Sequence, residues 1–163
     1  MLDHGQQAQS GNLMASSLAD ILIARYAGYE KKETRAGWFP SAQYPAQDGG
    51  EHVAAVAMQH EFGNPAERIP PRPFMRPAIA NKKQEWAKVV GGAVRQGLDA
   101  NDTLELVGLH MQGDIKEAIG DVTTPSLSQR TIKARQSRGN FDTKPLNDTG
   151  HMIATLTSSV AEK

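Results

Sequence analysis

The sequence contains no cysteine, few aromatic residues and no long apolar run. The absence of cysteine excludes disulfide bonds and thiolate chemistry, and it is typical of a protein that assembles in a reducing cytoplasm. The longest apolar runs, residues 21–24 and 53–58, are far shorter than the roughly 20 residues that a membrane-spanning helix needs. We therefore expect no membrane association.

The sequence also lacks the motifs of common enzymes. Its five histidines do not form H-E-x-x-H or another metal-ligand spacing, and there is no G-x-S-x-G motif or glycine-rich phosphate loop after a strand. Catalysis by a nucleophile, a metal or a phosphate-binding loop needs such residues at defined spacings. We expect no enzyme activity, no cofactor and no metal site. The histidines are at positions 4, 52, 60, 110 and 151.

The formal net charge is zero, because 18 Lys and Arg residues balance 18 Asp and Glu residues. The charges are nevertheless segregated along the chain. Residues 68–95 hold seven basic residues and one acidic, residues 99–121 hold six acidic and one basic, and residues 130–144 hold five basic and one acidic. General DNA binding needs a net basic footprint. The blocks therefore indicate pairing within the chain or between subunits, or simply solvated faces.

The apolar pattern predicts an α+β fold, with a small, mainly antiparallel sheet flanked by one long and several shorter helices. Residues 1–15 are expected to be a flexible segment, and residues 16–163 a single domain with a loop at 41–50. We expect Asp102 and Ser126 to cap helices and Gly28 to end one. The expected helices are 16–26, 51–62, 77–98, 102–119 and 126–136, and the expected strands are 33–39 and 153–160.

An extended proline-rich arm is expected at residues 64–77, because five of the nine prolines lie there. Proline fixes φ and removes a backbone donor, so such a segment is a stiff, extended arm. Arginine, phenylalanine and methionine suit interfaces, and the acidic residues 99–121 of a neighbouring copy are a natural partner. The alternative is a plain loop whose Phe74 fills the protein's own core. The candidate interface residues are Arg68, Pro70, Pro71, Arg72, Pro73, Phe74, Met75 and Arg76.

Three blocks of sequence resemble one protein family. An alanine-rich helix ending in E-F-G precedes I-P-P-R-P-F-M-R-P at residues 69–77; K-P-L-N-D-T-G-H-M follows at 144–152, and R-A-G-W-F lies at 35–39. In this order and spacing, the blocks resemble the tail-completion and head–tail joining (neck) proteins of tailed bacteriophages, also called phage virion morphogenesis proteins. The resemblance covers about residues 33–160. A thin C-terminal strand and an unmatched N-terminal helix depart from the family pattern.

The resemblance implies a structural virion protein that caps the tail tube and joins it to the DNA-filled head. It implies a homo-oligomeric ring, sixfold to match a tail tube, in contact with other neck and tail-tube proteins. DNA would pass through the lumen without sequence-specific binding. The charge segregation, rather than the resemblance, predicts that acidic residues face the lumen. The protein would be located in the virion neck or tail, and in the host cytoplasm during assembly.

Two alternatives stay open. One is a phage-encoded nucleic-acid-binding accessory protein that uses the basic blocks at 68–95 and 130–144. The other is a small phage-encoded hydrolase, which would need a pocket with convergent titratable groups.

Overall fold

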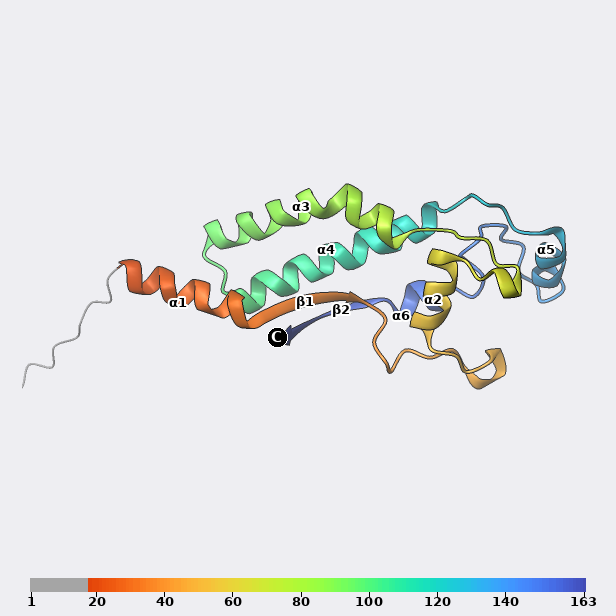
Figure 1. The fold of residues 1–163 in the computed structure, drawn as a ribbon, viewed down its shortest axis with the longest axis horizontal. Helices are drawn as coiled ribbons and strands as arrows, with labels where there is room; N and C mark the ends of the chain where they lie inside the picture. Colours follow the sequence, from red (N-terminus) through yellow and green to blue (C-terminus); the bar gives the residue numbers. More distant parts are fainter. Residues whose placement is uncertain (1–17) are drawn as a thin grey trace, which may run out of the picture.

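The computed structural model describes residues 18–163, so the expected flexible segment, residues 1–15, lies outside the described residues. Helices and one two-stranded antiparallel sheet make up the fold (Figure 1), and the predicted α+β class is confirmed. The elements are α1 (Leu18–Lys31), β1 (Lys32–Gly37), the 3₁₀ turn η1 (Ala46–Asp48), α2 (Val53–Phe62), the 3₁₀ turn η2 (Pro65–Glu67), α3 (Met75–Gln96), α4 (Ala100–Asp121), α5 (Gln129–Gln136), α6 (His151–Thr155) and β2 (Thr157–Glu162).

The helices α3 and α4 form an antiparallel hairpin that runs along the molecule (Figure 1). Each has 22 residues, so the fold has two long helices rather than one. The carboxylate of Asp99 caps α4 by accepting a hydrogen bond from the backbone N–H of Asp102 at 2.9 Å. The predicted cap at Asp102 was therefore wrong by one helical turn. An N-cap Asn or Asp satisfies a free N–H from the position just before the helix, whereas Asp102 lies inside α4.

The sheet pairs two strands that are far apart in the sequence. Strand β1 lies antiparallel to β2, with Lys32 opposite Glu162 and Gly37 opposite Thr157. The helix α4 packs against both strands. The predicted strand at 153–160 was partly wrong, because residues 151–155 form α6 and the strand begins only at Thr157. Within residues 18–163 no further strand pairs with the sheet, and both of its edges are open.

The core lies where α2, α6 and the ends of α3 and α4 meet. Phe74 and Leu156 are among its most deeply buried side chains. The indole of Trp38 packs edge-on against Phe74 with ring centroids 5.9 Å apart, and its Nε1–H donates to the Met152 carbonyl at 2.7 Å. A buried indole needs a partner for its N–H, so this bond holds the end of β1 against α6.

Most helix ends differ from the prediction by two or three residues, and two of them are informative. Helix α1 continues past Gly28 to Lys31, because Gly28 faces the first residue of α4: a Cβ at Gly28 would lie 2.9 Å from that of Ala100. Helix α5 begins at Gln129, and its cap is Ser128, whose Oγ accepts from the Thr131 N–H at 3.1 Å. The predicted cap at Ser126 was therefore wrong.

Gly108 lets α4 approach the sheet closely. A Cβ at this position would lie 2.7 Å from Thr34 Oγ1 and 3.1 Å from Ser158. We expect Gly108→Ala to lower the free energy of unfolding by about 1–3 kcal/mol, because the added methyl group overpacks this contact. Urea unfolding followed by circular dichroism measures the change.

Gly113 provides the matched control on the same helix. It is exposed, and a Cβ there would meet nothing within 4 Å. Gly113→Ala should stabilise the protein by about 0.5–1 kcal/mol through helix propensity alone. Equal effects of the two substitutions would contradict a sheet contact at Gly108.

Candidate functional site

The segment 64–77 is fastened to α2 through the buried carboxylate of Glu61. Glu61 Oε2 accepts hydrogen bonds from the backbone N–H of Phe74 at 2.7 Å and of Met75 at 2.9 Å. Its Oε1 accepts from the backbone N–H of Arg76 at 3.2 Å and from Arg76 Nε at 2.8 Å. The first N–H groups of a helix have no partner inside the helix, and the helix dipole favours a negative charge there. Glu61 therefore caps α3 from another element.

This capping lowers the pKa of Glu61. Burial by itself raises that pKa, but the hydrogen bonds from the Arg76 side chain and from three backbone N–H groups outweigh it. The carboxylate is thus held in its charged form.

Gly63 allows the segment to fold back onto α2. Its φ is +80°, a left-handed conformation that other residues rarely adopt, and a Cβ there would lie 2.9 Å from the backbone nitrogen of Pro71. The Arg72 N–H then donates to the His60 carbonyl at 2.6 Å. The glycine and the glutamate of the E-F-G block therefore both hold the proline-rich segment against α2.

Two of the predicted interface residues are buried within the monomer. Phe74 is 2% exposed in the core, and Arg72 is 6% exposed and donates from Nε to the Pro125 carbonyl at 2.8 Å. The prediction that these two side chains face a partner was wrong, because the protein's own core and the 122–128 loop surround them. The alternative, a loop whose Phe74 fills its own core, is confirmed for Phe74. The other predicted residues divide into the exposed Arg68, Pro71, Pro73 and Arg76 and the half-buried Pro70 and Met75.

Arg135 holds the block 144–152 in a similar way. It is 4% exposed, and its guanidinium donates to the carbonyls of Asp142, Lys144, Pro145 and Asn147 at 2.8–3.1 Å. A planar guanidinium with five donors can hold several carbonyls at once, which a lysine cannot. No pattern in the sequence indicated this role, because these carbonyls belong to an irregular loop.

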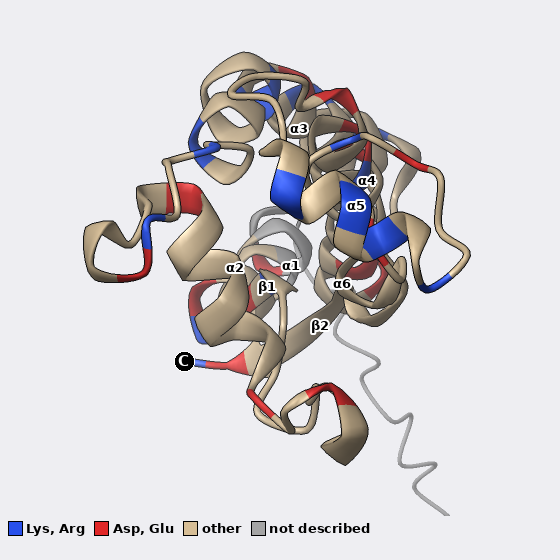
Figure 2. Ribbon diagram, turned by 90° about the vertical axis from the view of Figure 1, so that its right-hand side faces the viewer, with Lys and Arg blue, Asp and Glu red and all other residues tan. Residues whose placement is uncertain are grey.

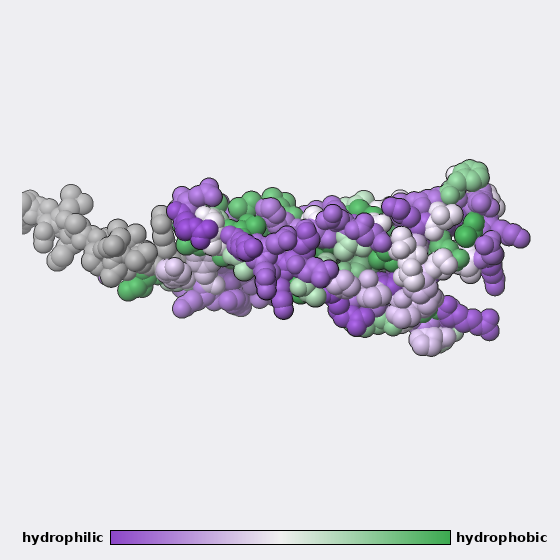
Figure 3. All heavy atoms as spheres, turned by 90° about the horizontal axis from the view of Figure 1, so that it is seen from above, coloured by the Kyte–Doolittle hydropathy of each residue, from purple (hydrophilic) through white to green (hydrophobic). Residues whose placement is uncertain are grey.

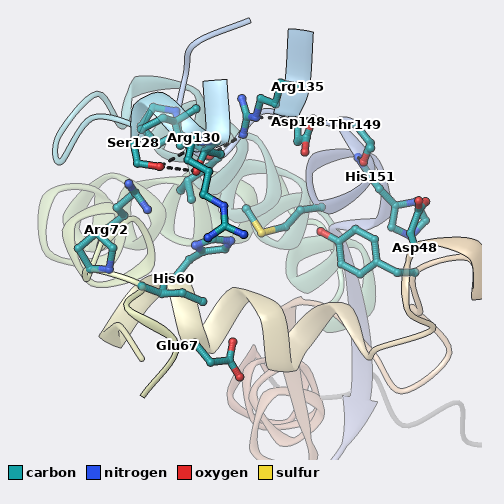
Figure 4. A pocket seen from close by; sticks show the side chains of 18 of the residues that line it. Asp48, His60, Glu67, Arg72, Ser128, Arg130, Arg135, Asp148, Thr149 and His151 are labelled. Atoms are coloured by element: carbon teal, nitrogen blue, oxygen red, sulfur yellow. Dashed lines mark hydrogen bonds and ion pairs between the residues drawn. The ribbon is translucent and has the colours of Figure 1, made fainter. Parts of the chain in front are cut away.

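A cleft of about 1200 Å³ lies between these two fastened segments (Figure 4). Its walls come from η1, α2, η2, α5 and α6, which gather at one end of the molecule (Figure 1). Figure 2, seen from that end, shows Lys and Arg positions along α5. Five arginines line the cleft, against three acidic residues. The arginines are Arg68, Arg72, Arg130, Arg135 and Arg138, and the acidic residues are Asp48, Glu67 and Asp148.

The pKa of His60 is lowered by burial and by the positive charges around the cleft. Burial lowers its pKa, and the charges of Arg72 and Arg135 lower it further. Its Nδ1 is buried without a hydrogen-bond partner. Asp148 is engaged, because it accepts from Arg138 at 2.9 Å and from the Asn140 side chain. The cleft is therefore suited to bind a negatively charged group.

In residues 18–163, no group of histidine and acidic side chains could hold a metal ion, and no helix is long and apolar enough to cross a membrane. Sequence reasoning missed the cleft, since its lining extends from Tyr44 to Met152 and no local motif marks it.

Comparison with known proteins adds no relative. No protein-family model, no curated protein and no solved structure matches this chain.

The Glu61 contact can be tested with Glu61→Gln. The amide loses the charge and turns an N–H₂ group toward backbone donors, so we expect the free energy of unfolding to fall by about 1–3 kcal/mol. Because folding lowers the pKa of Glu61, its contribution is present above the usual value of 4.5 and is lost as the pH falls through the folded-state pKa. Urea unfolding at pH 7 and below pH 4 should show a wild-type advantage that shrinks in acid. Glu67→Gln, at an exposed position, should change neither value.

The Arg135 contact can be tested with Arg135→Lys. A lysine cannot reach all four carbonyls, so we expect a loss of about 1–3 kcal/mol in thermal unfolding. Arg130→Lys, on the same helix but exposed, is the control and should leave the melting temperature unchanged. Equal melting temperatures for both variants would show that Arg135 does not hold the 144–152 block.

Proposed function

We propose that this protein is a structural subunit of a tailed-bacteriophage virion, a tail-completion or neck protein that caps the tail tube and joins it to the DNA-filled head. The proposal includes a homo-oligomeric ring, sixfold like a tail tube, in contact with other neck and tail-tube proteins. DNA would pass through the ring without sequence-specific binding.

One observation carries the proposal: the blocks that resemble the phage family all have structural tasks. The glutamate of E-F-G accepts hydrogen bonds from the backbone N–H groups of residues 74–76. Arg135 donates to the carbonyls of Lys144, Pro145 and Asn147 in the K-P-L-N block. Leu146 and Met152 of the last block are buried in the core. Such roles suit a protein whose motifs specify a shape, whereas an enzyme's motifs converge on a reactive centre.

The open sheet supports self-association. A two-stranded sheet leaves unpaired N–H and C=O groups along both edges, and such edges are templates for pairing with another chain. Large apolar side chains are also exposed on the neighbouring helices, including Ile23 and Tyr26 on α1 and Leu109 on α4. Contacts between copies would cover these groups.

The test is a phage that carries a stop codon early in this gene. We expect electron microscopy of its lysates to show DNA-filled heads beside separate tails, because the joint between them would be missing. Supplying the wild-type gene from a plasmid should restore joined, infectious particles.

Intact, infectious particles without the gene product would reject this function. The accessory-protein alternative then predicts that the purified protein shifts DNA in gels at physiological ionic strength, and that the shift disappears as salt rises. The exposed Arg68 and Arg130 are the residues that would serve it.

A further inference from the structure

Two arginines of the cleft have no partner in the described part of the chain. Arg68, at the end of η2, and Arg130, in the first turn of α5, are both exposed, and neither is paired within residues 18–163. Figure 4 shows the side chain of Arg130 extending into the cleft toward His60. The N-terminal end of a helix carries a partial positive charge, so an arginine in the first turn of α5 is unfavourably placed. An anion in the cleft would relieve this repulsion.

The end of α4 shows the opposite arrangement. Glu117 and Asp121 are exposed, lie one turn apart and are unpaired within residues 18–163. Like charges at this spacing repel each other, and the C-terminal end of a helix carries a partial negative charge. Lys144 Nζ donates to the Gly120 carbonyl at 3.3 Å, so one cation already lies at this end of α4, but within residues 18–163 it forms no ion pair with either carboxylate. A further cation beside Glu117 and Asp121 would relieve their mutual repulsion.

We propose that the cleft of one copy receives the acidic face at the C-terminal end of α4 from a second copy, with Arg68 and Arg130 facing Glu117 and Asp121. Each surface then supplies the charge that the other lacks. Arginine suits this role because its fork can bind a carboxylate through two hydrogen bonds. Two acidic lining residues, Asp48 and Glu67, are also exposed.

The size of the cleft favours a protein segment over a small molecule. Its volume of about 1200 Å³ exceeds the roughly 300–1,000 Å³ of typical small-molecule pockets. The face on which α3 lies is largely hydrophilic, with hydrophobic residues scattered between (Figure 3).

The contact joins two different surfaces, so it is heterologous. A heterologous contact closes into a ring when its rotation allows, and otherwise extends as an open chain. The inference deepens the proposed ring by naming its contact surfaces, and it rests on the proposed function only for the number of copies.

The experiment is a charge exchange in the purified protein. Variant one carries Arg68→Glu and Arg130→Glu, and variant two carries Glu117→Arg and Asp121→Arg. Each variant alone brings like charges together, so we expect its association constant to fall at least about tenfold in sedimentation velocity. Mixed in equal amounts, each cleft again meets an opposite charge, and association should return to near the wild-type value.

Two controls separate this contact from folding and from general charge effects. Melting temperatures of the variants should be no lower than that of the wild type, because all four positions are exposed and the changes on α4 and α5 suit the charge of each helix end. Lys83→Glu with Lys88→Glu makes the same change of charge on α3 and should leave association unchanged.

The proposal is overturned if the wild type stays monomeric at every concentration, if either variant associates like the wild type, or if the mixture shows no recovery. These outcomes differ from a failure of the proposed function. Infectious particles without the gene product would reject the virion role and leave the contact between copies intact.

Discussion

The carboxylate of Glu61 is the contact on which the arrangement of this protein depends. It joins the end of α2 to the first backbone N–H groups of α3 and to the side chain of Arg76. A buried carboxylate is stable only when its oxygens are satisfied, and free helix N–H groups are well suited to that task. The contact therefore fixes where the long hairpin begins. It also turns Phe74 into the core, where Trp38 packs against it.

Arg135 plays the corresponding part at the C-terminal side of the cleft. Residues 142–147 form no helix or strand, and the Arg135 guanidinium donates to four of their backbone carbonyls. Both walls of the cleft are thus held by a buried charged group that binds backbone atoms. Because those groups are already engaged, the arginines left for a partner are the exposed Arg68 and Arg130. The five arginines that line the cleft are therefore not equally available to a partner, because three of them already bind other groups of the protein.

The elements could largely be predicted from local patterns, while the site could not. Helical spacing of apolar residues located α2, α3, α4 and α5 to within a few residues, because burial on one face determines that spacing. The ends were less accurate: α1 continues past Gly28, since a glycine that packs against Ala100 does not have to end a helix. The arm was predicted to be extended over residues 64–77, but Pro65–Glu67 form η2, α3 begins at Met75, and the side chains of Arg72 and Phe74 are buried. Proline content reports backbone stiffness and says nothing of which side chains a neighbouring element covers.

The sequence by itself determined the α+β class and the charge segregation, and it located the blocks that resemble a phage neck protein. These properties depend on residues close together in the chain. The tertiary structure alone decided that Glu61 binds residues 74–76, that Lys32 lies opposite Glu162, and that residues from Tyr44 to Met152 line one cleft. Contacts between distant residues depend on how helices and strands pack. Packing is decided by the shape and burial of the whole chain, so no local pattern records it.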